Sequence, residues 1–149
     1  MTANNAGTLR VVLYSHDSQG LGHTRRNLAL AHALTEGFAQ AGRQVSGVLV
    51  TGVAAATRFE APGGWDWLVM PGVAKSAGGY LPRHLAVQHK RIIKLRSSLI
   101  SAVLNDFRPH LVVVDRHPFG VDHELADGLV KLRRKRPSCR VVLGLREVL

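Results

Sequence analysis

Five short apolar runs recur along this chain of 149 residues, at residues 10–15, 44–51, 65–70, 110–115 and 140–145. Each run is apolar almost without interruption rather than at alternate positions, which predicts a strand that is buried on both faces. Buried strands that alternate with helices form a parallel sheet covered by helices on both sides. The sequence therefore predicts an α/β fold of three layers, whose mostly parallel sheet has about five strands.

The stretches between the runs have helical periodicity. Helices are expected over residues 27–41 and 83–107, a short helical piece over 54–59, and a loop followed by a helix over 118–136. The first helix has a natural end at Gly42. Its expected apolar face consists of Leu30, Leu34, Phe38 and Ala41. The expected apolar face of the longest helix consists of Leu85, Ile92, Leu95, Leu99, Val103 and Phe107.

The loops that follow the strands are the expected place for a ligand, because parallel sheets bind ligands beyond the carboxyl ends of their strands. The loops after residues 15, 70 and 115 should therefore converge on one rim of the sheet. The second of them, residues 71–82, contains Gly72, Gly78 and Gly79. Its length and glycine content predict a mobile binding loop.

The chain is long enough for one domain with a buried core. We expect residues 1–8 to be a flexible lead-in and residues 9–149 to be a single Rossmann-like domain that is truncated at its C-terminus. No apolar run approaches the roughly 20 residues that span a bilayer, and the first residues lack the charged and apolar regions of a secretion signal. The single Cys139 excludes an internal disulfide framework, so a cytoplasmic location is expected.

The chain carries a formal charge of +10, from 20 Lys and Arg against 10 Asp and Glu. Such a charge favours phosphates, nucleic acid or anionic lipid as partners. The excess is concentrated at residues 83–96 and 131–140, where either a solvated basic face or a functional patch would explain it. Aromatic residues make up only 5% and do not alternate with the basic ones, which argues against a nucleic-acid partner.

A glycine-rich turn joins the first strand to the first helix, and residues 15–26 read SHDSQGLGHTRR. Its glycines let the backbone approach a ligand closely, and the free N–H groups at a helix start favour negative charge. Arg25 and Arg26 oppose the helix dipole, so a ligand is a better explanation for them than helix stability. We therefore expect this turn to bind a phosphorylated or sugar-like group. The candidate binding residues in it are His16, Gly20, Gly22, Arg25 and Arg26.

Several familiar motifs are excluded. A dinucleotide fingerprint needs Gly or Ala where Arg25 stands, and an acidic residue after the second strand. A Walker A loop needs a Gly-Lys-Ser/Thr sequence, which is absent. Residues 15–17, Ser-His-Asp, are adjacent and point in different directions, unlike a hydrolase triad. The His, Asp and Glu residues at 16–23 and 117–124 lack zinc-ligand spacing, so neither a metal nor a cofactor is expected.

His23 and Asp115 are the candidate catalytic pair. His23 lies at the mouth of the glycine-rich turn, and Asp115 ends the fourth strand near the middle of the expected sheet. A carboxylate that holds one imidazole nitrogen orients the ring and leaves the other nitrogen free to take a proton from a hydroxyl. Each residue could instead be a cap or a surface group, but their shared rim favours a joint role. His117, two residues beyond Asp115, is a candidate for substrate binding.

Residues 11–31 and residues 111–125 resemble two segments of the GT-B glycosyltransferases. The similarity is closest to a predicted bacterial group related to the peptidoglycan GlcNAc transferase, whose members open with a strand, a glycine-rich turn ending in Gly-His and a helix rich in Leu and Ala. The resemblance implies two Rossmann-like domains with a cleft between them. This chain would be the N-terminal domain, which binds the acceptor. The C-terminal domain, which binds the nucleotide-sugar such as a UDP-sugar, would be supplied in cis or in trans.

The same resemblance implies roles for individual residues. It assigns His23 as the base on the acceptor hydroxyl and Asp115 as its partner. Gly20, Gly22, Arg25 and Arg26 would face the acceptor diphosphate. The implied acceptor is a sugar that can be phosphorylated or lipid-linked, and residues 83–96 would contact the inner face of the membrane.

Two other functions are compatible with the residues alone. The first is a non-enzymatic Rossmann-like module that binds phosphate groups or an anionic surface through its basic patches. The second is a nucleotide-binding regulatory domain. A strong salt dependence of binding favours the first, and nucleotide affinity of this chain alone favours the second.

Overall fold

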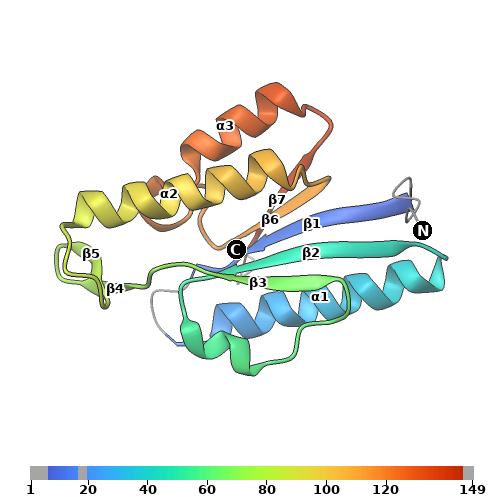
Figure 1. The fold of residues 1–149 in the computed structure, drawn as a ribbon, viewed down its shortest axis with the longest axis horizontal. Helices are drawn as coiled ribbons and strands as arrows, with labels where there is room; N and C mark the ends of the chain where they lie inside the picture. Colours follow the sequence, from blue (N-terminus) through green and yellow to red (C-terminus); the bar gives the residue numbers. More distant parts are fainter. Residues whose placement is uncertain (1–6, 17–19, 146–149) are drawn as a thin grey trace.

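A five-stranded sheet forms the middle layer of the protein (Figure 1). The computed structural model describes residues 7–16 and 20–145. The strands follow the order β3-β2-β1-β6-β7, and all four neighbouring pairs are parallel. The predicted α/β fold with a parallel sheet is confirmed. The strands are β1 (Thr8–Tyr14), β2 (Gln44–Thr51), β3 (Trp65–Val69), β6 (Leu111–Asp115) and β7 (Arg140–Gly144).

Helices cover the sheet on both sides (Figure 1). Helix α1 (Gly22–Gln40) lies on one face, and helices α2 (His89–Asp106) and α3 (Ala126–Lys135) lie on the other. Two short 3-10 helices, η2 (Ala54–Arg58) and η3 (Val121–His123), occur in the connections. This arrangement is the three-layer, Rossmann-like sandwich that the alternating pattern predicts.

Successive side chains of β1 serve two separate apolar cores, because side chains alternate between the faces of a strand. Val11 and Leu13 pack with Ala31 on the side of α1. Val12 and Tyr14 lie in the core on the opposite side, which includes residues of α2 and α3. The central strand is therefore buried on both faces, as its uninterrupted apolar sequence predicts.

Helix α1 begins at Gly22 and not at residue 27 as predicted. Its first turn therefore contains the second half of the glycine-rich segment. The predicted apolar face is confirmed in part: Leu34 and Phe38 pack against the core, whereas Leu30 is 38% exposed and Asn27 and Ala31 are buried. The reason is that the helix starts with polar residues at the rim, and these occupy the inward face there.

The segment predicted as a mobile loop, residues 71–82, is instead a β-hairpin. Strand β4 (Val73–Ser76) pairs antiparallel with β5 (Gly79–Pro82), and two residues, Ala77 and Gly78, connect them. Gly79 has a φ of +127°, which a glycine adopts without a steric penalty. The glycines therefore make a tight turn, because a two-residue hairpin connection requires unusual backbone angles.

Helix α2 begins at His89 rather than at residue 83, and its predicted apolar face is confirmed only in part: Ile92 is buried and Leu99, Val103 and Phe107 pack against the core. Leu85 and Leu95 are 44% and 41% exposed. The buried positions of α2 are Ile92, Arg96, Ile100 and Leu104. They recur every four residues, so the helix turns toward the sheet a face that includes an arginine. An apolar-periodicity argument could not place a charged side chain there.

The edge strand β7 departs from the prediction that every strand is buried on both faces. Val141, Val142 and Leu143 are 45%, 46% and 38% exposed. No helix among the described residues covers this edge fully, because α1 lies under β1, β2 and β3 (Figure 1).

The predicted N-terminal lead-in, residues 1–8, ends earlier than expected, since β1 already includes Thr8. Residues 1–6, 17–19 and 146–149 lie outside the described part of the chain.

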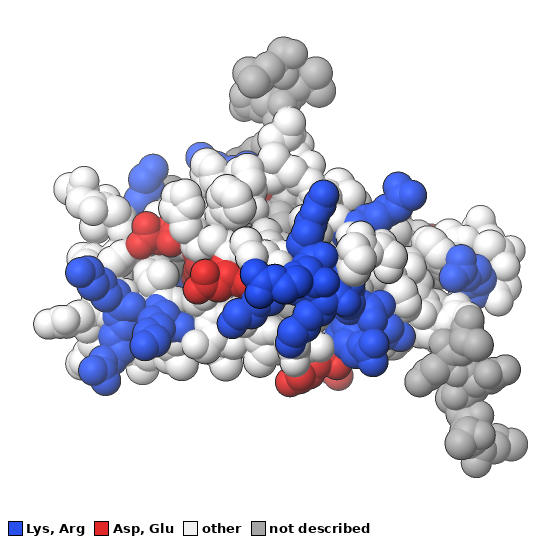
Figure 2. All heavy atoms as spheres, turned by 90° about the horizontal axis from the view of Figure 1, so that it is seen from above, with Lys and Arg blue, Asp and Glu red and all other residues white. Residues whose placement is uncertain are grey.

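The basic residues gather on the surface of α2 and α3. Figure 2 shows blue side chains over much of this face, with few red ones among them. Lys90, Arg91 and Lys94 of the first predicted basic run are exposed, but Arg96 is completely buried. The segment proposed to meet a membrane therefore presents fewer cations than its sequence suggests. No helix in residues 7–16 and 20–145 has the length and apolarity needed to cross a bilayer.

Candidate functional site

The carboxyl ends of β1 and β6 form the rim of the candidate site. The chain runs from β1 outward to β2 and β3 on one side, and reaches β6 and β7 on the other. At such a switch in strand order, the connections leave the sheet in opposite directions and open a crevice for ligands. Ser15 and His16 follow β1 directly, and Asp115 ends β6. The first turn of α1 brings His23 and Arg26 to the same rim.

The predicted pair of His23 and Asp115 is in direct contact. Nδ1 of His23 lies 2.5 Å from Oδ2 of Asp115, and their side chains are only 10% and 2% exposed. The Nδ1 side of the ring therefore faces the carboxylate, and Nε2 lies on the opposite side of the ring. Among the described residues, Nε2 has no hydrogen-bond partner. The arrangement leaves a basic nitrogen available to a ligand at the rim.

Arg26 completes the contacts of Asp115. Its Nη2 lies 3.3 Å from Oδ1 of Asp115 and donates a hydrogen bond to the carbonyl oxygen of Leu145 at 3.3 Å. Arg26, which the sequence predicts to bind phosphate, therefore faces a buried carboxylate in this structure. With one oxygen facing an arginine and the other an imidazole, Asp115 is held in a fixed orientation.

The other residues that the sequence predicts to bind phosphate are spread along the turn. Gly20 has a φ of +67°, Gly22 is the first residue of α1, and both have open space where a Cβ would stand. The guanidinium of Arg25 lies 5.3 Å from the ring centre of Phe59, in the geometry of a cation–π contact. The structure thus does not bring Arg25 to Asp115. Binding of a phosphate by these residues stays a prediction.

His16 and His117 lie close together at the rim, as predicted. Their ring centres are 4.7 Å apart, and the ring of His16 is 6.2 Å from that of His23. Tyr80, on β5 of the hairpin, places its hydroxyl 3.2 Å from Nε2 of His16. The sequence predicted a binding role for this segment but did not single out Tyr80. An aromatic residue directly after the two glycines was the available signal.

His16 is neutral at physiological pH. Burial, together with the charges of His117, Arg116 and other nearby cations, lowers the pKa of His16 to about 4. Its side chain is almost fully buried, and Nδ1 has no hydrogen-bond partner in the described part of the chain. A neutral imidazole can donate from one nitrogen and accept at the other. His16 can therefore bind a hydroxyl without adding charge beside His23.

This lowered pKa predicts a loss of stability in mild acid. The unfolded chain has an ordinary histidine pKa near 6.5, so it binds more protons than the folded chain as the pH falls from there toward about 4. The free energy of unfolding should fall over this window by about 1–3 kcal/mol from His16. Urea unfolding near neutral pH and near pH 4, compared with His16→Gln, measures it. An equal pH dependence of the two proteins would contradict the prediction.

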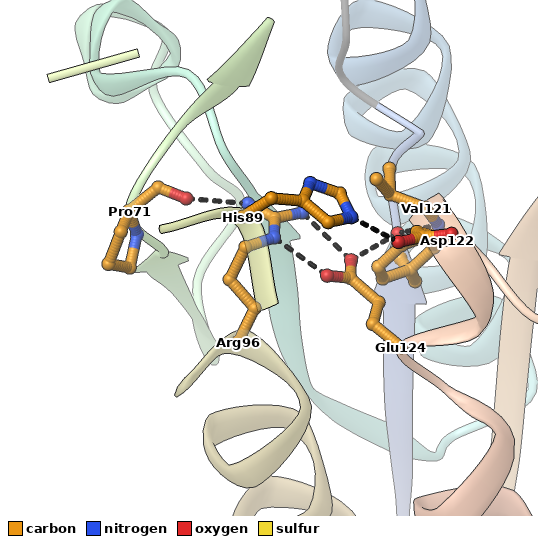
Figure 3. A network of polar contacts seen from close by, with 7 residues as sticks. Pro71, His89, Arg96, Val121, Asp122 and Glu124 are labelled. Atoms are coloured by element: carbon orange, nitrogen blue, oxygen red, sulfur yellow. Dashed lines mark hydrogen bonds and ion pairs between the residues drawn. The ribbon is translucent and has the colours of Figure 1, made fainter. Parts of the chain in front are cut away.

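A buried polar network connects α2, β1 and the loop that follows β6 (Figure 3). Arg96 of α2 donates to both carboxylate oxygens of Glu124, at 2.7 and 2.8 Å, and to the carbonyl of Pro71 at 2.7 Å. Tyr14 of β1 donates to Glu124 at 2.6 Å and accepts from the backbone N–H of Val121. Burial and the charge of Glu124 raise the pKa of Tyr14 well above its usual value, so the hydroxyl stays protonated. Sequence reasoning missed this network.

The loop between β6 and α3 has an unusual backbone. Arg116, Asp122 and His123 have φ values of +69°, +47° and +60°, in the left-handed region that side chains disfavour. A Cβ at Gly120 would lie 2.7 Å from the Tyr14 hydroxyl. Nε2 of His89 lies 2.6 Å from Oδ2 of Asp122, so α2 also holds this loop. Strain of this kind is commonly stored where a loop positions a functional site.

Comparisons with protein-family models, with curated proteins and with solved structures found no match to this chain. Among the described residues, no three His, Cys, Asp or Glu side chains converge as metal ligands.

The geometry itself indicates the chemistry that the rim can perform. His23 offers a basic nitrogen whose ring is oriented by Asp115. His16 and Tyr80 offer uncharged hydrogen-bonding groups beside it. This combination suits the removal of a proton from a hydroxyl that neighbouring polar groups hold in place.

Proposed function

We propose that this chain is the acceptor-binding half of a glycosyltransferase, which moves a sugar from a nucleotide-sugar to an acceptor hydroxyl. The observation that carries the proposal is the 2.5 Å contact between His23 and Asp115 at the switch point of the sheet. The resemblance of residues 11–31 and 111–125 to GT-B glycosyltransferases points to the same two residues. The Rossmann-like fold is the one that such a half requires.

In the proposed reaction, Nε2 of His23 takes the proton of the acceptor hydroxyl as its oxygen attacks the anomeric carbon of the donor sugar. The bond from that carbon to the nucleotide breaks, and the nucleotide leaves with the bonding electrons. Asp115 stabilises the imidazolium that forms, because its carboxylate faces the Nδ1 proton.

Neighbouring groups have supporting roles in this proposal. His16, His117 and the hydroxyl of Tyr80 surround the His23 ring and would bind further acceptor groups. The backbone at Gly20 and Gly22 is open to a phosphate of the acceptor. A second domain, in cis or in trans, would bind the nucleotide-sugar, and a lipid-linked acceptor would bring the enzyme to the inner face of the membrane.

Replacing His23 by glutamine tests the proposed base. Turnover should fall by about 10²–10⁴-fold, while the KM for the acceptor changes little, because the base acts only as the proton moves. The assay follows label from a panel of UDP-sugars into lipid and soluble carbohydrate acceptors, with this chain joined to or mixed with its donor domain. The matched control is His84→Gln, since His84 is exposed on the surface.

Unchanged turnover of H23Q would eliminate His23 as the base. Absence of transfer from every donor, with salt-dependent binding of phosphate groups retained, would favour the non-enzymatic module instead.

A further inference from the structure

A separate polar pocket lies between α2 and α3, toward the ends of both helices. Its volume is about 230 Å³. Ligand pockets for drug-sized molecules begin at about 300 Å³, so this one suits a smaller group. Helix α2 begins beside the hairpin and ends before β6, which puts the pocket at the opposite end of α2 from the rim (Figure 1). Polar and charged residues that line it are Ser101, Asn105, Arg108, Lys131, Lys135 and Arg136.

The charge of the pocket is strongly positive. Four of its lining residues, Arg108, Lys131, Lys135 and Arg136, are cations, and no described lining residue is Asp or Glu. The carboxyl ends of α2 and α3 lie near it, and each helix end supplies roughly half a negative charge. Together, the two helix ends offset the charge of about one of the four cations. The remaining positive charge favours a bound anion.

Unsatisfied hydrogen-bond donors also point to an anion. Nε of Arg136 is buried and has no partner among the described residues, which costs free energy unless an acceptor binds there. Nζ of Lys135 donates to Oδ1 of Asn105 at 2.8 Å, which uses one of its three protons. Burial and the charges of Arg10 and Arg136 lower the pKa of His110 nearby, consistent with a positive potential at this end.

Gly128 shapes the pocket by allowing the two helices to approach. A Cβ at this position would lie 3.0 Å from Oγ of Ser101 and 3.1 Å from Cδ1 of Leu104. The close approach on one side and the long basic side chains on the other border a small space. The lining cations Arg108, Lys131 and Lys135 are exposed, whereas Nε of Arg136 is buried, so the pocket combines exposed positive charge with a buried free donor.

We propose that the pocket between α2 and α3 binds a small multiply charged phosphate, of the size of phosphate or diphosphate. Guanidinium groups match the oxygens of a phosphate through parallel hydrogen bonds, and lysine ammonium groups neutralise its charge. The site is distinct from the rim, so the proposal does not depend on glycosyl transfer. It also assigns a ligand to Lys131, Lys135 and Arg136 of the second predicted basic run.

Titration of the full chain with pyrophosphate tests this site, with sodium chloride added to keep the ionic strength constant. Calorimetry should show saturable binding, and the unfolding temperature should rise with pyrophosphate concentration. Lys131→Gln and Lys135→Gln should each weaken the affinity at least about tenfold, because each removes a charged hydrogen bond to the anion. Circular dichroism checks that both variants fold, and either one suffices if the other does not.

Lys94→Gln is the matched control, because Lys94 is an exposed lysine in the first half of α2. It removes the same charge and should change the affinity by less than about twofold. Binding that is not saturable, or an equal loss in K94Q, would overturn the proposal by showing that only the overall charge matters. His23→Gln should leave pyrophosphate binding unchanged, so failure here and failure of the proposed reaction can be told apart.

Discussion

Replacing Arg96 by methionine is expected to lower the free energy of unfolding by about 3–5 kcal/mol. Arg96 and Glu124 have side chains that are 0% exposed, and they share two hydrogen bonds. Removing the guanidinium leaves the buried carboxylate of Glu124 with only the Tyr14 hydroxyl as a hydrogen-bond partner among the described residues. It also removes the donor to Pro71, so three separate segments lose a common anchor.

Urea unfolding of the R96M variant measures this loss, and Arg91→Met is the control on the exposed side of the same helix. The control should change stability by less than about 0.5 kcal/mol. A double variant, Arg96→Met with Glu124→Gln, should recover much of the stability because no unpaired charge remains. Equal losses in R96M and R91M, or a double variant less stable than R96M, would contradict this explanation.

Replacing Asp115 by asparagine is expected to reduce turnover of the proposed transferase by about 10³–10⁴-fold, the scale seen when the orienting carboxylate of a Ser-His-Asp triad is lost. In the proposed reaction, Asp115 faces Nδ1 of His23 and accepts its proton, which leaves the lone pair on Nε2. An asparagine amide can donate to Nδ1 instead and so favour the opposite tautomer. Nε2 then carries a proton and cannot act as a base.

The measurement is kcat and the acceptor KM of D115N, with Asp127→Asn as the control because Asp127 is exposed in the first turn of α3. The KM should change little, since Asp115 acts through the His23 ring rather than on the acceptor. Turnover within about tenfold of the wild type would show that the carboxylate does not control the tautomer.

The layer order and the location of the candidate site could be predicted from the sequence. Uninterrupted apolar runs leave no polar face for a strand, which predicted the covered parallel sheet, although the equally apolar β7 forms an exposed edge strand. The carboxyl ends of parallel strands share one edge, which placed Asp115 beside the turn that holds His23. The shared rim was predicted, and the structure brings the two side chains into contact at 2.5 Å.

Charged partners far apart in the sequence were not predictable in this way. Arg96 shares the inward face of α2 with Ile92 and Ile100, but its charge indicated a surface position, and its burial depends on Glu124, which is 28 residues away. The sequence predicted a loop at residues 71–82 because this segment contains three glycines and its two strands are only four residues long. Only the fold brings Tyr80 of this segment to His16.

The sequence by itself determined the alternating strands and helices, the parallel sheet and the rim that carries His23 and Asp115. Those features depend on local periodicity and on the rule that parallel strands end at a common edge. The tertiary structure alone decided the buried network of Tyr14, Arg96 and Glu124, the hairpin against His16 and the basic pocket between α2 and α3. Each of these depends on side chains that meet only after packing, because a polar group is buried only where a partner satisfies it.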